Sequence, residues 1–176
     1  MRPKKILIAY FSRKGNNYVD GRIVNLAVGN TELAAKKIQE LAGGELFRID
    51  TLMSYPADYE EATEVAKKEL RAKSRPELLG QVEEMEAYDC IILGYPNWWG
   101  TAPMAVFSFL EAYDFSGKTI LPFCTHEGSG LGHSEADIKK TCPGATLLPG
   151  LAIVGGRVGK ADREIEAWLG RSGVMG

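Results

Sequence analysis

Hydrophobic runs of strand length alternate with helical patterns along most of the chain. Strand-length runs are continuously apolar, whereas helical segments repeat apolar side chains at spacings of three or four. We expect strands at 6–11, 46–49, 90–94, 119–124 and near 147–154. We expect helices at 30–42, 58–70, 104–113, 134–140 and 161–169. This alternation is typical of an α/β fold, in which right-handed crossovers place helices on both faces of a parallel sheet.

A doubly wound sheet of this kind binds ligands beyond the carboxyl ends of its strands, where the strand order reverses. The chain contains no internal repeat, low-complexity tract or obvious linker. We therefore expect one domain over residues 1–176. We look for functional residues just after the first, third and fourth expected strands.

Composition and charge exclude several classes of protein. The 176 residues are 45% hydrophobic and 25% charged, which is ordinary for a globular chain. The net charge of -2 gives no basic surface for nucleic acid. The stretch 90–110 is uncharged but is interrupted by glycines and prolines, so we expect no membrane span. The three cysteines form no Cys-x-x-Cys pair, which favours free thiols in a reducing, cytoplasmic compartment.

The segment after the first strand offers groups that suit a phosphate. It contains Ser12 and Lys14, and Gly29-Asn30-Thr31 later opens the first helix. Free backbone N–H groups and the helix dipole favour an anion at such a helix start. A purely structural alternative is that Asn30 or Thr31 only caps the helix.

The loops after the third and fourth strands add a flat apolar surface and a flexible polar segment. Trp98 and Trp99 are adjacent in a loop bounded by Pro96 and Gly100, and such rings can stack on a heteroaromatic ligand. Packing in the core or in a dimer interface is the alternative. The second loop runs over 125–132, and its glycines allow the backbone to approach a ligand closely. One ligand site explains all three loops together.

A metal site is not expected. Cys124, His126, His133 and Cys142 have the right chemistry, but their spacing matches no common zinc pattern. A relaxed nucleotide-binding P-loop at 112–119 follows a helix and opens a strand, which is the reverse of what that motif requires.

The three segments resemble those of the flavodoxin-like FMN-binding proteins, over nearly the whole chain from residue 4 to about residue 169. The resemblance lies in strand 6–11 running into Ser12, in the Gly29-Asn30-Thr31 helix start, and in the Gly-Tyr-Pro-Asn-Trp-Trp-Gly sequence at 94–100. It implies a three-layer, doubly wound sheet of five parallel strands in the order 2-1-3-4-5, with FMN as cofactor.

The resemblance also implies roles for named residues. The phosphate would be held by Ser12, Lys14, Asn30 and Thr31. The isoalloxazine ring would be lined by Pro96, Asn97, Trp98, Trp99 and Gly100. The pyrimidine edge of the ring would meet Thr125, His126, Glu127, Gly128 and Ser129.

The sequence departs from the usual flavodoxin pattern in three ways. Residues 18–28 are inserted into the phosphate segment, so either Asn16-Asn17 or Asn30-Thr31 supplies its amides, and the helix start favours the second pair. The third loop has His126 as its only flat side chain, which leaves one flavin face open to a substrate. The charge of -2 gives little steering toward basic redox partners.

These features predict an FMN protein that transfers electrons, either as a carrier or by reducing a small acceptor such as a quinone. Its expected partners are a redox protein, or NAD(P)H with a small acceptor, and a homodimer is possible. We assign no catalytic residue, and His126 is the first choice if one exists. The rival hypotheses are a non-redox anion-binding domain of the same fold and a signalling module.

Overall fold

The computed structural model describes residues 4–174 and contains a parallel sheet in the predicted order. Its main strands are β1 (Ile6–Tyr10), β4 (Glu45–Arg48), β5 (Cys90–Pro96) and β6 (Thr119–His126). Two short strands, β7 (Thr146–Leu147) and β8 (Leu151–Val154), both pair with β6. The spatial order is β4-β1-β5-β6-β7. Counted along the parallel strands, this order is the predicted 2-1-3-4-5.

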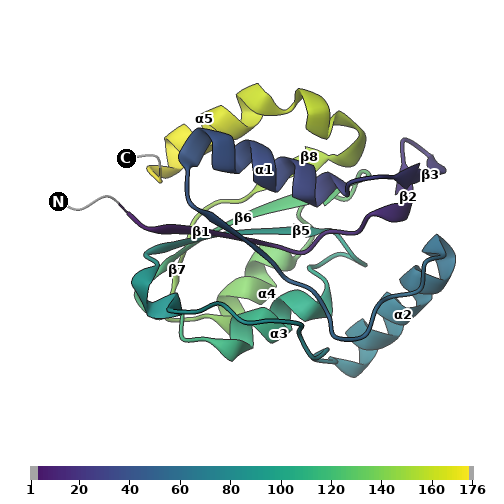
Figure 1. Ribbon diagram of the computed structural model, residues 1–176, viewed down its shortest axis with the longest axis horizontal. Coiled ribbons are helices and arrows are strands. Elements are labelled where there is room, and N and C mark those ends of the chain that lie inside the picture. The colour runs from purple at the N-terminus through teal and green to yellow at the C-terminus, as the bar shows by residue number, and fades with distance from the viewer. Residues whose placement is uncertain (1–3, 175–176) are drawn as a thin grey trace.

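Helices cover both faces of the sheet. The helices α1 (Asn30–Ala42) and α5 (Asp162–Ser172) pack together on one face, and α3 (Met104–Ala112) and α4 (Ser134–Thr141) pack on the other. The helix α2 (Tyr59–Ala72) packs against α3 and β2, and it projects beyond the carboxyl ends of the strands (Figure 1). Short 3-10 helices occupy Met85–Ala87 and Gly155–Lys160.

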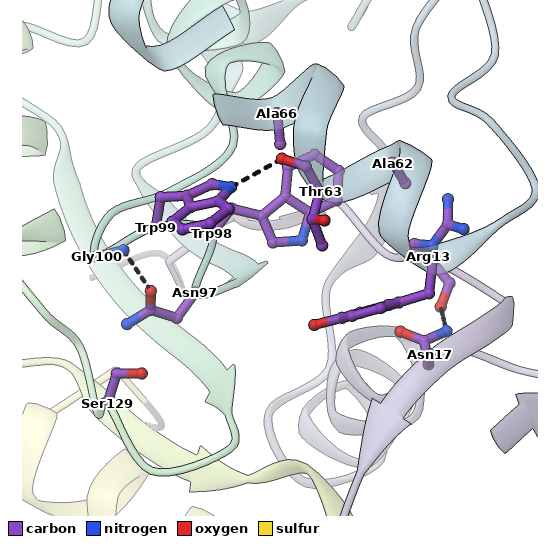
Figure 2. Close-up of a pocket in the computed structure, with 11 residues that line it drawn as sticks. Arg13, Asn17, Ala62, Thr63, Ala66, Asn97, Trp98, Trp99, Gly100 and Ser129 are labelled. Atoms are coloured by element: carbon purple, nitrogen blue, oxygen red, sulfur yellow. Dashed lines mark hydrogen bonds between the residues drawn. The ribbon is translucent and has the colours of Figure 1, made fainter. Parts of the chain in front are cut away.

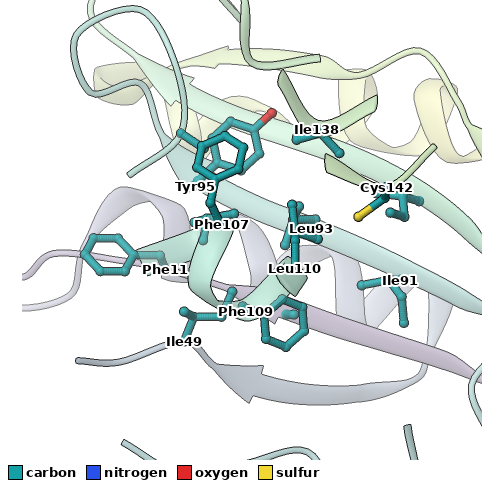
Figure 3. Close-up of a cluster of buried hydrophobic side chains, with 14 of the residues drawn as sticks. Phe11, Ile49, Ile91, Leu93, Tyr95, Phe107, Phe109, Leu110, Ile138 and Cys142 are labelled. Carbon is teal, nitrogen blue, oxygen red and sulfur yellow. The ribbon is translucent and has the colours of Figure 1, made fainter. Parts of the chain in front are cut away.

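Each face of the sheet has its own hydrophobic core. The side chains of β1 and β5 alternate between the two cores, since successive side chains of a strand point to opposite faces. Ile91 and Leu93 pack with Phe107 and Phe109 of α3 in one cluster (Figure 3). Ile92 and Ile8 pack with α1 and α5 in the other. Burial on both faces explains why these strands read as continuous apolar runs.

The inserted segment is a β-hairpin that the sequence patterns did not predict. β2 (Gly15–Val19) pairs antiparallel with β3 (Arg22–Leu26). Asp20 and Gly21 form a two-residue turn, with φ angles of 53° and 82°. Positive φ at both central residues matches the right-handed twist of a hairpin, and Asp-Gly is a preferred sequence for it.

The last predicted strand, 147–154, is wrong as a continuous element. Residues 148–150 separate β7 from β8. Pro149 lies in this gap, and proline has no N–H group to donate to the neighbouring strand.

The uncharged stretch 90–110 forms strand β5, a loop and most of helix α3. Within residues 4–174, no helix combines the length and the apolar character that a membrane crossing requires.

Candidate functional site

The loops after β1, β5 and β6 meet at the carboxyl edge of the sheet, where two cavities adjoin. The larger cavity has a volume of about 450 Å³ and the smaller about 210 Å³. Both are bordered by Arg13, Asn17, Tyr59, Asn97, Trp98 and Ser129. The smaller cavity extends to the start of α1, whereas the larger one lies between the β5 loop and α2 (Figure 2).

The smaller cavity ends at the N-terminus of α1. Thr31 is buried there, and its hydroxyl lies 2.7 Å from that of Thr125. The Ser12 hydroxyl accepts a hydrogen bond from the Glu32 amide at 3.0 Å. The amides of Asn30 and Thr31 have no hydrogen-bond acceptor among the described residues. Two free N–H groups at a helix start form an anion-binding position.

Gly155 keeps this end of the site open. It borders the smaller cavity, and a Cβ on it would lie 2.7 Å from the side-chain nitrogen Nδ2 of Asn30 and 2.6 Å from a Glu127 carboxylate oxygen. Any larger residue at this position would displace one of these two side chains. The fold therefore brings the start of α1, the β6 loop and the segment after β8 to one point.

The β5 loop forms a tight turn with an unusual backbone. Trp98 and Thr101 exchange backbone hydrogen bonds, and Trp99 and Gly100 both have positive φ, at 58° and 91°. The Asn97 side chain accepts from the Gly100 amide at 2.8 Å and donates to the Gly130 carbonyl at 2.8 Å. Asn97 therefore fixes both the turn and its distance from the β6 loop.

The two tryptophans are held in different surroundings. Trp98 is half-buried, and its ring makes edge contacts with Phe11 and Tyr55, each at a centroid distance of 5.1 Å. Trp99 is 47% exposed and donates its indole N–H to the Thr63 carbonyl of α2 at 2.9 Å (Figure 2). Both rings border the larger cavity.

The β6 loop is organised by its own side chains. Thr125 is buried, and His126 accepts from the Gly128 amide through Nδ1 at 2.9 Å. One Glu127 carboxylate oxygen accepts from the Asp20 amide of the hairpin tip at 2.7 Å. Ser129 borders both cavities, whereas Gly128 borders neither.

The structure brings most of the predicted site residues together. The two cavities are bordered by Asn30, Thr31, Pro96, Asn97, Trp98, Trp99, Gly100, Thr125, His126, Glu127 and Ser129. Lys14 is exposed and borders neither of them. Ser12 borders a third cavity of about 120 Å³, which shares Arg13 and Trp98 with the other two.

The alternative amide pair has structural partners instead. The Asn16 side-chain oxygen accepts from the Tyr59 amide at the start of α2, at 2.7 Å. Asn17 donates to the carbonyls of Arg13 and Gly15. Asn30 and Thr31 open α1 beside the smaller cavity, which Asn17 also borders.

The sequence patterns missed the residues contributed by the hairpin and by α2. These residues are Tyr18 of the hairpin and Tyr59, Ala62, Thr63 and Ala66 of α2, and Arg13, which precedes the hairpin, was missed as well. The Asp20-Gly21 pair was an available signal for the hairpin. The capping box at Asp58 correctly marked where α2 begins. No local pattern shows which part of the fold a helix faces.

Burial changes the ionisation of two residues that border the cavities. It lowers the pKa of the Arg13 guanidinium and raises the pKa of the Tyr59 hydroxyl. Arg13 donates to the backbone carbonyls of Asn16 and Ala57. Because its pKa is raised, the Tyr59 hydroxyl is neutral at physiological pH.

These residues fit FMN in their chemistry. One end of the paired cavities offers free helix-start amides and hydroxyls, which suit a phosphate. The other end is bordered by the rings of Trp98 and Trp99, which suit a flat heteroaromatic ring. Asn97 and Ser129 supply polar groups where the two cavities join.

Comparison with known proteins agrees with a flavin-binding site. The model of a family described as flavodoxin matches residues 5–172. A crystal structure described as a candidate flavoprotein from Bacteroides eggerthii is 31% identical, with a TM-score of 0.75, and the match covers 95% of this chain and 96% of that one. A second, from Bacteroides uniformis, is 28% identical, with a TM-score of 0.78 and coverage of 96% and 99%.

A flavoprotein from Lactobacillus acidophilus, solved in complex with FMN, shares the fold. It is 22% identical, with a TM-score of 0.68, and the match covers 89% of this chain and 97% of that one. A search of curated proteins gave no significant match. The match of the family model over residues 5–172 shows that this chain belongs to the flavodoxin family.

Proposed function

We propose that this protein binds FMN and transfers electrons through it, as a carrier or by reducing a small acceptor such as a quinone. The observation that carries the proposal is the pair of free backbone amides at Asn30 and Thr31 beside the smaller cavity, which adjoins the larger cavity bordered by both indole rings. When bound, FMN would supply the redox chemistry, and the protein would supply orientation and electrostatics.

The phosphate would lie at the start of α1. Asn30 and Thr31 border the smaller cavity at this position, and the Thr31 hydroxyl is paired with that of Thr125. Lys14 is exposed and outside the cavities, so its contribution would be long-range attraction only. The membership in the flavodoxin family and the FMN held by a structural relative support the same cofactor.

The isoalloxazine ring would lie beside the Asn97–Gly100 turn. The hydrogen bonds of Asn97 preorganise this turn, so little ordering would remain when the ring binds. Thr125 and Ser129 would contact the polar edge of the ring. No ionisable side chain has to act as an acid or base, and the His126 ring is already bonded within its own loop.

Titration of the protein with FMN, followed by visible absorbance and flavin fluorescence, tests the proposal. Thr31→Val removes a hydroxyl from the phosphate position and should weaken FMN binding by about tenfold, or about 1.4 kcal/mol. Thr146→Val is a matched control on an exposed residue of β7. Absence of FMN binding by the wild-type protein would instead support an anion-binding module without redox function.

Anaerobic addition of NADPH and then NADH to the FMN-loaded protein separates the two modes of action. Bleaching of the flavin band by either nucleotide would indicate direct reduction by a hydride donor. Reduction by dithionite alone would indicate a carrier that depends on a partner reductase.

A further inference from the structure

A cavity of about 430 Å³ lies outside the proposed FMN site. It is bordered by the segment 51–56, by Pro76 and Glu77, and by Val65 and Glu69 of α2. None of these residues borders either of the two cavities proposed for FMN. Its volume falls within the range of about 300–1,000 Å³ that is typical of small-molecule sites. The cavity is therefore separate from the FMN site and large enough for a ligand of its own.

One wall of this cavity is fixed by backbone hydrogen bonds. The Leu52 amide donates to the Glu77 carbonyl, and the Leu79 amide donates to the Asp50 carbonyl, each at 2.8 Å. These bonds join the segment after β4 to the segment after α2 as a short antiparallel pair. The wall is consequently formed before any ligand arrives, so binding would require little ordering of the chain.

The surface of the cavity is mainly apolar and accessible to water. Leu52 and Met53 are 54% and 83% exposed, and Pro56, Val65 and Pro76 border the same cavity. Exposed apolar side chains that gather at a cavity indicate a binding surface for an apolar group. The flexible Met53 side chain can adapt to the shape of such a group.

Glu69 gives this apolar cavity a charged group. Its side chain is partly buried, and its Oε1 atom accepts from the Tyr55 hydroxyl at 2.6 Å. Its Oε2 atom has no hydrogen-bond donor among residues 4–174. Burial raises the pKa of this carboxyl, and the hydrogen bond from Tyr55 offsets the increase only in part. The Glu69 charge is therefore incompletely compensated within the protein.

The ionisable side chains that border the cavity are all acidic. They are Glu69 and Glu77, and no lysine, arginine or histidine of the described chain joins them. Arg75, next to Pro76 in sequence, pairs with Glu111 instead. An anion would be repelled here, and a purely apolar ligand would cover the Glu69 charge without giving it a partner. A cation would form charge-assisted hydrogen bonds with it.

We infer that this cavity binds a small organic cation, in which a protonated amine is attached to an apolar or aromatic body. The ammonium group would donate to Oε2 of Glu69, and the exposed Glu77 carboxylate would attract it from outside. The apolar body would cover Leu52 and Met53 and displace water from them. This inference does not depend on the proposed FMN function, because the two sites share no bordering residue.

Calorimetric titration with three naphthalene probes of similar shape tests the charge of the ligand. At neutral pH 1-naphthylmethylamine is a cation, 1-naphthylmethanol is neutral and 1-naphthoate is an anion. The amine should bind at least about tenfold more tightly than the alcohol, and the carboxylate should bind more weakly than either. Equal affinities of the amine and the alcohol would overturn the inference.

Glu69→Gln tests the carboxylate that would hold the amine. The variant keeps the shape of the side chain and can still accept from Tyr55, so the fold should be retained. It should raise the dissociation constant of the amine by at least about tenfold and leave that of the alcohol within about twofold. Glu64→Gln is the matched control, because it removes the same charge from an exposed position of α2 that does not border the cavity.

The control variant should leave the affinities of both probes within about twofold of the wild-type values. Equal weakening of the amine by Glu64→Gln and Glu69→Gln would show that the overall charge of the protein attracts the probe. The assigned site would then be wrong.

Met53→Ala tests the apolar wall. Because Met53 is 83% exposed, its truncation should leave the fold intact. It should weaken the binding of the amine and the alcohol alike, by about threefold or more. Unchanged affinities in this variant would place the body of the ligand elsewhere and contradict the inference.

The same titrations with and without FMN separate this inference from the proposed function. The affinity for the amine should agree within about twofold in the two states, because the cavities are separate. If FMN displaces the amine, the amine occupies the FMN site and the inference is wrong. If the protein binds the amine as described but does not bind FMN, the proposed function is wrong and the inference stands.

Discussion

The two sides of the cavity are attached to the fold in different ways. The β5 and β6 loops are joined by backbone contacts: the Gly100 carbonyl accepts from the His133 amide at 2.8 Å, and Gly132 lies directly against it. The opposite side, which we call the cover, consists of the hairpin β2–β3 (15–26) and α2 (59–72). The cover is attached through side chains: Glu127 accepts from the Asp20 amide of the hairpin, and the Trp99 indole donates to the Thr63 carbonyl of α2.

This difference indicates which part of the site sets its geometry and which part can adapt. Contacts between buried backbone groups leave little freedom, because each donor and acceptor needs its partner. Exposed side-chain contacts cost little to break, and regions held by them open locally with low free energy. We therefore expect the loops to define the cofactor position and the cover to admit ligands.

The largest effect should come from adding a methyl group between the two loops. In Gly132→Ala the new Cβ would lie 2.2 Å from the Gly100 carbonyl oxygen, at a φ of +56°. Neither backbone can move without breaking hydrogen bonds, so we expect a loss of about 2–4 kcal/mol in the free energy of unfolding. Urea denaturation of the variant and the wild-type protein measures this loss.

Gly128→Ala is the matched control within the same loop. Its Cβ would meet no atom within 4 Å, and its φ of +137° leaves only backbone strain, which costs about 1 kcal/mol or slightly more. If the two variants were equally stable, the loops would not be in the tight contact described above.

A smaller effect should follow from removing the side chain that links the loops. Asn97→Ala leaves the Gly100 amide and the Gly130 carbonyl without their present partner, at a cost of about 1–3 kcal/mol. Glu127→Ala removes the contact between the cover and the β6 loop, which is exposed, and should cost less than about 1 kcal/mol. Thermal unfolding of both variants tests this order. A larger loss of stability in Glu127→Ala than in Asn97→Ala would show that the cover is held more firmly than the loops.

The difference between the two sides also explains what could be predicted from the sequence. Buried parallel strands produce continuous apolar runs, so strands such as 90–94 and the loops that follow them were predictable. The helix start at Asn30 and the capping box at Asp58 are local signals. Together they located the residues contributed by the loop side of the site.

The cover was missed because its position depends on distant contacts. The inward face of α2 carries alanines, and neither Ala62 nor Ala66 differs locally from an alanine on any surface helix. Its placement depends on Asn16, Arg13 and Trp99, which lie far away in sequence. Long-range hydrogen bonds of this kind leave no periodic pattern in the chain.

The helices α1 and α2, of which only α2 belongs to the cover, should respond to pH with opposite sign. In α1, hydrogen bonds from Lys36 and then Arg48 lower the pKa of Glu32 below its ordinary value of 4.5, so its ionised form stabilises the fold. In α2, burial raises the pKa of Glu69, and the hydrogen bond from Tyr55 offsets this only partly. The Glu32 contribution is present above pH 4.5 and is lost as the pH falls through the folded-state pKa. Glu69 lowers the stability of the fold as the pH rises above the pKa that this carboxyl has in the unfolded chain.

Melting temperatures of two variants between about pH 3 and about pH 7 test the signs. Glu32→Gln should lower the melting temperature at neutral pH and have little effect at the acid end. Glu69→Gln should raise it slightly at neutral pH, because the buried charge is removed. A lower melting temperature for Glu69→Gln at neutral pH would show that the Tyr55 contact outweighs burial.

The smallest expected effect lies in the cover alone. Tyr18→Ala removes a ring that is 41% exposed and stacks on Tyr59 at 6.0 Å, so the global loss should stay below about 1 kcal/mol. Hydrogen exchange should nevertheless become faster in β2, β3 and α2, while β5 and β6 keep their protection.

Burial also raises the pKa of Cys124, beneath the β6 loop, to about 12, so this thiol should remain unlabelled by a thiol reagent in the native variant. Labelling of Cys124, or faster exchange in β5, would show that the cover and the loops open as one unit, and the proposed division of the site would then be wrong.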